Sequence, residues 1–386
     1  MIRRLAAGMG VATFGFSTLA TTVPLYALAQ DASPGLIGAL VALPALLPVL
    51  VGVRLGERMT GRAAVRWLRR GTVAMAAAPV VLALAPGLVL LAAAQAWLGA
   101  AQLAAVLAAQ ALVASLGRDA TLERDYAAYA TSLSAGRLVG PVAAGAAIDA
   151  TGFRAAFALA AAAIALGAAI VAAIPARVAA DAGTPSPRPT SRNPWRGAGP
   201  LLARPAVRLA VLASGGLFVA LSVRQAFVPV ALAELGASAS TIGLLLSLGA
   251  AAAVAVRPFA PWAARRMGGA PRVLVASTVV VAACLVGLGL APVPAAFAPL
   301  LVGLGAAIGV SLPLSLSIVA RDVDVDARGR ALGVRLVVNR AVQLVAPSAA
   351  GVAIAVGGIA VGFGAAATVL AVLAAVTARL APRSGR

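Results

Sequence analysis

The sequence predicts an all-α membrane protein with about twelve transmembrane helices arranged as two pseudo-symmetric six-helix bundles. Of its 386 residues, 62% are hydrophobic and 11% are charged, whereas a soluble domain carries about 25% charged residues. The mean hydropathy is +1.01. Apolar segments recur along the whole chain, and parts of the first half reappear in the second. Most of the chain is therefore expected to lie in lipid.

Each expected span is an apolar run bounded by turn residues. A helical span needs about 20 apolar residues, and the breaks contain Asp, Pro and Gly, as at 31–34 and 149–152. Gly and Pro inside the runs are compatible with transmembrane helices. The expected spans are 6–29, 35–55, 71–85, 88–116, 128–148, 154–175, 207–232, 241–260, 273–291, 294–319, 331–354 and 357–378.

The basic residues indicate how the chain is oriented. All 31 are arginine, and the formal net charge is +20. If the N-terminus is cytoplasmic, nearly all loop arginines fall on the inner side and only Arg154 falls outside. The positive-inside rule then places both termini in the cytoplasm. Because the arginines serve mainly to orient the chain, we expect no nucleic-acid partner. The absence of Lys and the abundance of Ala and Gly fit a GC-rich bacterial genome, so we expect the bacterial inner membrane.

The composition also limits the chemistry of any site. The chain has no histidine and one cysteine, Cys284. Disulfides, histidine metal sites and Ser-His triads are therefore excluded. Without lysine, the Lys-containing ATP-binding loop cannot form. We expect no cofactor and no metal.

An internal repeat divides the chain into two halves. Residues 23–38 align without gaps with 228–243. Pro141 recurs as Pro347 and Gly145 as Gly351 at one common offset, whereas Arg137 recurs as Arg340 at an offset three residues shorter. A polar segment rich in Pro, Ser and Arg lies between the halves. We expect a bundle over 1–176, a cytoplasmic linker over 177–206 and a second bundle over 207–386, the layout of transporters that rock one bundle against the other.

The loop between spans two and three carries a recognisable pattern, Gly56-Glu57-Arg58-Met59-Thr60-Gly61-Arg62. It resembles the loop signature of the major facilitator superfamily, with one extra residue before Gly61. The resemblance implies that Glu57, Arg58, Gly61 and Arg62 latch the cytoplasmic ends of helices as a gating loop. A basic loop that only follows the positive-inside rule is the alternative.

Span five contains a glycine-rich segment that runs from Gly136 to Gly145. It is similar to the signature described for antiporters of that superfamily, although Ala144 replaces a glycine. Gly136, Gly140 and Gly145 allow a neighbouring backbone to approach closely, and Pro141 bends the helix. The resemblance implies the drug:proton antiporter-like branch and favours export. Helix packing alone remains the alternative.

Polar residues inside the spans are the candidates for substrate binding. A charge at mid-membrane costs at least ~2.5–3.5 kcal/mol, so it should face water or a partner. Arg257 and Arg335 lie near cytoplasmic span ends and are expected to snorkel. Bonding between neighbouring helices is the alternative role of the polar groups. The candidate substrate-binding residues are Arg137, Arg340, Arg224, Gln225, Asn339, Gln343 and Gln102.

The acidic residues bear on proton coupling. All 11 Asp and Glu residues fall in loops or near span ends, so no span centre offers a carboxylate. Asp149 and Glu234, at the expected outer mouth, are the possible proton sites. Mid-membrane arginines without an acidic partner indicate that a substrate anion or a neutral oxygen pairs with them.

Two function classes follow. The first is a monomeric secondary active transporter that works by alternating access and exports a small organic or amphipathic compound by proton antiport. An organic-anion carrier that uses Arg137 and Arg340 is its alternative. The second class is a membrane-embedded enzyme built around Asp322, Asp324 and Asp326. We favour instead a cytoplasmic turn in which these acids balance nearby arginines, because alternate acids are weak evidence for a metal. A non-transporting sensor on the same fold stays open.

Overall fold

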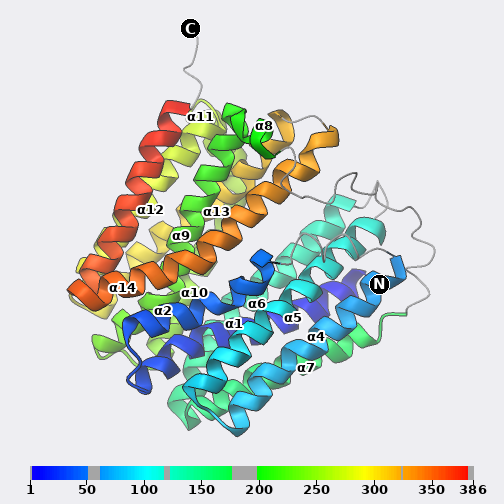
Figure 1. The fold of residues 1–386 in the computed structure, drawn as a ribbon, viewed down its shortest axis with the longest axis vertical. Helices are drawn as coiled ribbons and strands as arrows, with labels where there is room; N and C mark the ends of the chain where they lie inside the picture. The colour runs from blue at the N-terminus through cyan, green and yellow to red at the C-terminus, as the bar shows by residue number, and fades with distance from the viewer. Residues whose placement is uncertain (1, 51–60, 117–121, 176–197, 323–324, 381–386) are drawn as a thin grey trace. The chain divides into compact units, whose positions relative to one another are not determined.

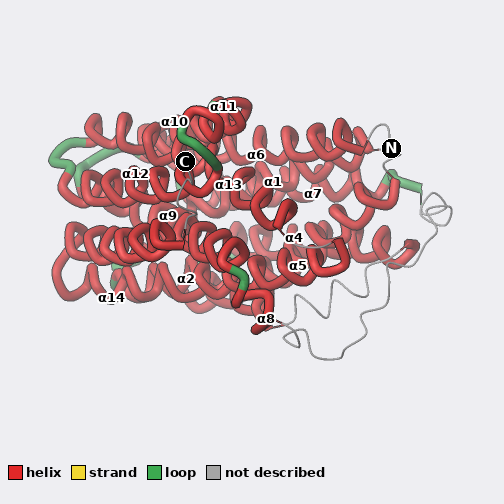
Figure 2. The backbone as a smooth tube through the Cα atoms, turned by 90° about the horizontal axis from the view of Figure 1, so that it is seen from above, coloured by secondary structure: helices red, strands yellow, loops and turns green. Residues whose placement is uncertain are grey.

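The computed structural model describes residues 2–50, 61–116, 122–175, 198–322 and 325–380. These residues form helices and connecting turns and contain no strand (Figures 1 and 2). Three short 3-10 turns, Leu43–Ala45, Arg257–Phe259 and Pro294–Ala296, interrupt the α-helices. The α-helices are α1 Ile2–Ala29, α2 Pro34–Ala42, α4 Gly61–Leu84, α5 Leu88–Leu116, α6 Leu122–Thr151, α7 Phe153–Ala172, α8 Ala198–Ala203, α9 Pro205–Glu234, α10 Ala239–Ala255, α11 Ala260–Arg266, α12 Ala270–Leu290, α13 Phe297–Asp322 and α14 Val325–Leu380.

Nine of the helices in these ranges are long and apolar enough to cross a membrane. The apolar segment Pro34–Leu50 is shorter. The long helix α14 is broken at Gly357 and Gly358, and Gly358 has a φ of 77°, which an L side chain adopts only with strain. The all-helical membrane fold is thus confirmed, while the count of about twelve spans stays a prediction.

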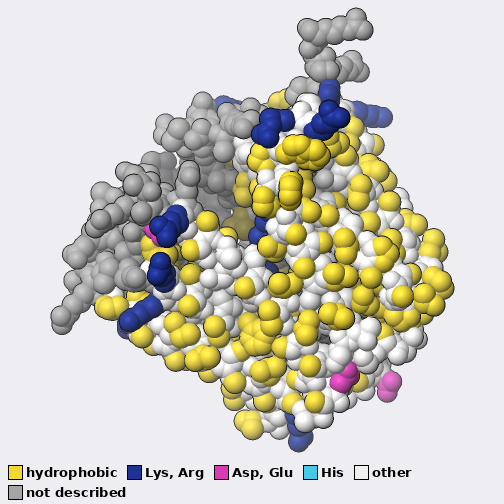
Figure 3. All heavy atoms as spheres, turned by 180° about the vertical axis from the view of Figure 1, so that it is seen from behind, with side chains coloured by type: hydrophobic (Ala, Val, Ile, Leu, Met, Phe, Trp, Pro, Cys, Tyr) yellow, Lys and Arg dark blue, Asp and Glu magenta, His cyan; other side chains and the backbone are white. Residues whose placement is uncertain are grey.

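Prolines occur inside several helices without ending them, for example Pro24 in α1, Pro141 in α6 and Pro347 in α14. Transmembrane helices tolerate proline because neighbouring groups take over the freed backbone positions. The surface is also that of a membrane protein. Val89 and Val356 are 87% and 85% exposed, and hydrophobic side chains cover most of the described face in Figure 3.

The helices form two compact units. Unit 1 consists of Met1–Gln30, Leu43–Arg192 and Ser238–Ser247, and unit 2 consists of Asp31–Ala42, Asn193–Ala237 and Leu248–Arg386. Helix α2 therefore belongs to unit 2, and the first half of α10 belongs to unit 1. In unit 1, α1 packs on α6 and α7, and α4 packs on α5 and α7. In unit 2, α14 packs on α9, α12 and α2.

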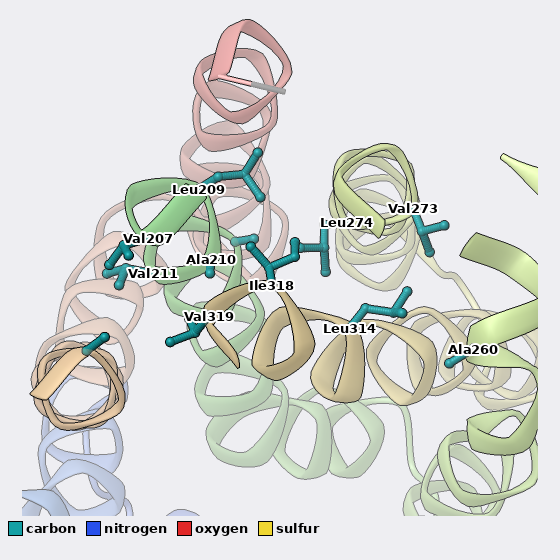
Figure 4. Packing of buried hydrophobic residues seen from close by; sticks show 12 residues of the cluster. Val207, Leu209, Ala210, Val211, Ala260, Val273, Leu274, Leu314, Ile318 and Val319 are labelled. Atoms are coloured by element: carbon teal, nitrogen blue, oxygen red, sulfur yellow. The ribbon is translucent and has the colours of Figure 1, made fainter. Parts of the chain in front are cut away.

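A dense apolar cluster joins the helices of unit 2 at one end (Figure 4). Its fully buried members include Val207 from α9, Leu274 from α12 and Val319 from α13. In a membrane such side chains hold helices together through van der Waals packing. This cluster holds the ends of α9, α12 and α13 together next to the polar residues of α14.

In unit 2, the backbones of α2 and α14 approach closely at two glycines. A Cβ on Gly38 would collide with the carbonyl oxygen of Pro347, and one on Gly351 would collide with that of Pro34. Only glycine permits backbones to meet at this distance. We call this contact the α2–α14 crossing.

Unit 1 contains a matching contact between α6 and the first half of α10. A Cβ on Gly243 would collide with the carbonyl oxygen of Pro141, and one on Gly145 would collide with that of Ala239. These residues are the repeat partners of those in the α2–α14 crossing. The internal repeat of the sequence thus produces two matching contacts, and we call the second one the α6–α10 crossing.

We predict that Gly243→Ala and Gly38→Ala each lower the free energy of unfolding by about 1–3 kcal/mol, because the new methyl group must push the two backbones apart. The measurement is unfolding of the purified protein in mixed micelles with increasing dodecyl sulfate. Gly35→Ala is the matched control, since no atom lies within 4 Å of its added Cβ. Equal stability of the control and crossing variants would contradict the prediction.

Candidate functional site

The buried polar residues of α14 lie on one face at helical spacing, beginning with Arg335 and Asn339. Asn339 is 4% exposed, and its Oδ1 accepts a hydrogen bond of 3.0 Å from the hydroxyl of Ser214 in α9. Ser214 is fully buried. This bond ties α9 to α14 across their shared face. An interhelical polar bond of this kind is worth about 0.6–2 kcal/mol.

Arg335 is buried, with 8% of its surface exposed. Its Nη2 donates a hydrogen bond of 2.7 Å to the hydroxyl of Ser315 in α13, and its Nε is buried without a hydrogen-bond partner. The expectation that Arg335 snorkels to the membrane surface is therefore wrong. The side chain turns towards α13 because the hydroxyl of Ser315 accepts a hydrogen bond from it inside unit 2.

Arg340 and Gln343 lie together one turn further along α14. The Nη1 of Arg340 donates a hydrogen bond of 2.9 Å to Oε1 of Gln343, and both side chains are half-buried. Gln343 stands four residues before Pro347, as Arg137 stands four residues before Pro141 in α6. By the crossings, Gln343 is thus the counterpart of Arg137. The hydrogen bond to Gln343 therefore places the guanidinium of Arg340 beside the residue that corresponds to Arg137.

Arg137 lies on α6 in unit 1, and its side chain is exposed. Its backbone carbonyl accepts a hydrogen bond of 3.4 Å from the hydroxyl of Ser17 in α1. On either side of it, Gly136 and Gly140 lie against the backbone of α1, where a Cβ would meet Phe14 and Ser17. The glycines therefore fix the face of α6 that touches α1 and leave Arg137 on another face.

The remaining substrate candidates are spread over other helices. Arg224 is half-buried in α9, and its Nε is buried without a hydrogen-bond partner. The adjacent Gln225 is exposed, and Gln102 is half-buried in α5 of unit 1. The structure therefore brings Arg340 and Gln343 into contact and provides Asn339 with a partner outside the candidate set.

The two candidate proton sites differ in their surroundings. Glu234 is exposed at the end of α9. The carboxylate of Asp149, at the end of α6, accepts hydrogen bonds of 3.0 Å from the N–H of Ala239 and 2.8 Å from the N–H of Ser240. Slight burial raises the pKa of Asp149, but hydrogen bonds from Ser240, Ala239 and Ser238 outweigh it, and the net pKa is lowered. A lowered pKa keeps Asp149 ionised at neutral pH.

Some sequence-predicted residues lie outside the described residues. Glu57 and Arg58 of the expected gating loop are among them, as is Asp324. Gly61 and Arg62 begin α4, but the side chains of Arg62, Asp322 and Asp326 lie outside the description. Among the residues with described side chains, no group of three or more His, Cys, Asp or Glu could hold a metal ion.

Sequence reasoning missed three buried serines, of which Ser214 and Ser315 bond to polar residues of α14. Ser214, Ser311 and Ser315 are all fully buried, and Ser311 has no hydrogen-bond partner for its Oγ. Ser311 and Ser315 lie one turn apart on α13, on opposite sides of Pro313. The two serines at helical spacing around Pro313 could have indicated a polar face on this span. Only the structure shows which helix that face meets.

We predict that the Arg335 to Ser315 bond contributes a coupling energy of about 1.5–3 kcal/mol, the range for hydrogen bonds to charged groups. Ser315→Ala should destabilise the protein more when Arg335 is present than after Arg335→Met, because in both cases it also removes the bond that Ser315 donates to the carbonyl of Leu312. A double-mutant cycle of unfolding free energies measures the coupling. Ser317→Ala is the control, because its hydroxyl bonds within its own helix to Leu314. Additive effects of Ser315→Ala and Arg335→Met would contradict the prediction.

Solved structures with the same fold cover nearly the whole chain. A POT family transporter in complex with a thioalcohol-conjugated peptide superposes with a TM-score of 0.80 at 14% identity, covering 99% of this chain and 96% of that one. The nucleoside transporter NupG gives 0.78 at 13% identity, with 99% and 100% covered. A bacterial homolog of the human lysosomal transporter Spinster, inward-facing and occupied, gives 0.75 at 14% identity, with 98% and 95% covered.

These identities are low, so the structural matches show the fold alone. Comparison of the sequence with curated proteins gives no match. The family model of the Major Facilitator Superfamily matches residues 5–231 and 215–386, which together span almost the entire chain. Members of that family transport solutes and are not enzymes, so the enzyme alternative is dismissed. The chain belongs to the major facilitator superfamily of membrane transporters.

Proposed function

We propose that the protein is a secondary active transporter that moves a small organic anion across the bacterial inner membrane by alternating access. Both termini lie in the cytoplasm in this proposal, the chain works as a monomer, and the bundles over 1–176 and 207–386 rock about the linker over 177–206. Arg137 and Arg340 bind the anionic group of the substrate. The membership of the family carries the transporter part of the proposal.

The single observation that carries the substrate class is the chemistry of the buried polar groups. Arg340 donates to the neutral amide of Gln343, and Arg335 donates to the neutral hydroxyl of Ser315. The acidic residues of the sequence all lie in loops or near span ends. A guanidinium in a membrane interior gains most from a carboxylate or phosphate, with which it forms paired hydrogen bonds. We therefore assign to Arg137 and Arg340 the binding of a substrate anion, which would supply such an acceptor.

Export of an amphipathic compound by proton antiport is the second candidate. The glycine-rich segment of α6, from Gly136 to Gly145, favours it through its similarity to the antiporter signature. The candidate proton sites support it less. The carboxylate of Asp149 already accepts hydrogen bonds from two amides of α10. Its pKa is lowered, whereas a proton carrier near neutral pH requires a raised pKa. Glu234 is the remaining carboxylate for this role.

We predict that benzoate stabilises the detergent-purified protein and that tetraphenylphosphonium does not. A ligand at 100 times its Kd should add about 2.7 kcal/mol, which a thermal-shift assay resolves. Arg137→Gln and Arg340→Gln should each abolish the stabilisation by benzoate. Arg154→Gln is the matched control, because this exposed arginine lies at the start of α7 in the expected outer loop.

The outcomes separate the candidates. Stabilisation by tetraphenylphosphonium that is unaffected by both arginine variants overturns the anion proposal and favours the amphipathic exporter. Counterflow of labelled benzoate into proteoliposomes tests transport itself. A protein that binds benzoate but shows no counterflow is a sensor and not a carrier.

A further inference from the structure

Asp149 provides a helix cap across two helices. Its Oδ1 accepts from the N–H of Ala239 and its Oδ2 from the N–H of Ser240, at 3.0 and 2.8 Å. These are two of the backbone donors that the first turn of a helix leaves without an internal partner. A carboxylate there also faces the positive end of the helix dipole. Both helices contribute to unit 1, and the cap lies directly beside the contact of Gly145 with Ala239.

The other crossing has no equivalent cap. By the repeat, Ala239 corresponds to Pro34, Ser240 to Gly35 and Asp149 to Ala355. Ala355 has no carboxylate, and Pro34 has no N–H to donate. The hydroxyl of Ser33, the residue before α2, accepts a bond of 3.4 Å from the N–H of Leu36, just as Ser238 accepts one of 3.2 Å from Thr241 in α10. The difference between the two described helix starts is therefore the carboxylate of Asp149. The two matching crossings are therefore held by different forces.

The groups that shift the pKa of Asp149 among the described residues are uncharged. The perturbation of its pKa comes from burial and from hydrogen bonds of Ser238, Ala239 and Ser240, without a contribution from a charged neighbour. The charged residues nearest in sequence to the two ends of the cap are Arg154, five positions after Asp149, and Glu234, five positions before Ala239. Neither residue is among the groups that shift the pKa of Asp149.

We propose that Asp149 is a latch that holds the start of α10 on α6 and thereby sets how often the α6–α10 crossing opens during transport. This inference rests on the proposed function, because alternating access requires the expected outer side to open. Opening of the α6–α10 crossing then breaks two hydrogen bonds to a carboxylate. Opening of the α2–α14 crossing breaks only close apolar contact.

Ser247 offers a position from which opening can be observed. It is 5% exposed, belongs to unit 1, and follows Gly243 by one helical turn on α10. Because it lies nearly two turns beyond Ser240, fraying of the first turn alone does not uncover it. Ser247→Cys places a small thiol there, and Cys284→Ala removes the native thiol.

We predict that Asp149→Asn raises the rate at which a methanethiosulfonate reagent labels this thiol by about 2- to 5-fold, the factor that corresponds to an exposed anion at a helix N-terminus. The full-length protein in detergent is used, and Asp149→Glu, which keeps the charge, should restore part of the protection. Asp31→Asn is the matched control, since Asp31 is an exposed carboxylate on the expected outer side. Its labelling rate should equal that of the parent.

Two results would overturn the latch. One is an unchanged labelling rate in Asp149→Asn, with faster hydrogen exchange confined to residues 239–241, which indicates a local cap only. The other is an equal increase in Asp31→Asn. Because labelling needs no substrate, an unchanged rate together with benzoate counterflow overturns the latch alone, whereas faster labelling without counterflow overturns the transport proposal alone.

The latch should not respond to physiological changes in pH. A lowered pKa means that its stabilisation is complete above the ordinary pKa of Asp149, 3.8, and is lost only as the pH falls through the lowered value. We predict that the ratio of labelling rates between Asp149→Asn and its parent is constant between about pH 5 and 8. A ratio that falls towards one within this range would contradict this prediction.

Discussion

Close approach of helix backbones is the constraint on which this structure depends. In lipid, the apolar side chains of neighbouring helices gain little by meeting, so van der Waals packing between backbones and scattered polar bonds must hold the helices together. The glycines at 38, 243, 145 and 351 meet this need because each lies against a carbonyl of the partner helix.

The fold was largely predictable from the sequence, whereas the helix that each polar side chain points towards was not. Apolar run length and the arginine distribution are properties of one segment at a time, so they predict spans without the structure. The repeat predicted that Pro141 matches Pro347, and the crossings contain that match. The same repeat also aligned Arg137 with Arg340 at a shorter offset. Only the crossings show that Gln343 occupies the position of Arg137.

Arg335 illustrates why depth in a span is a poor guide to environment. Its place near the expected cytoplasmic end of the span suggested a side chain that reaches the membrane surface. Its actual direction depends on α13, where Ser315 presents a hydroxyl at the right height. No pattern within 331–354 contains that information. The same holds for Asn339, whose partner Ser214 lies 125 positions away along the chain.

The proline at the start of α2 has a historical consequence. A chain formed from two related halves begins with equal positions, and each can then change independently. Because Pro34 has no amide hydrogen, an acid at position 355 would gain at most one partner, the amide of Gly35, and selection on it would be correspondingly weak. Alanine at 355 fits this position, because an acidic side chain there would find fewer amide donors than Asp149 does. The two halves of this protein share an architecture, but they differ in the number of amide donors that each offers to an acid at this position.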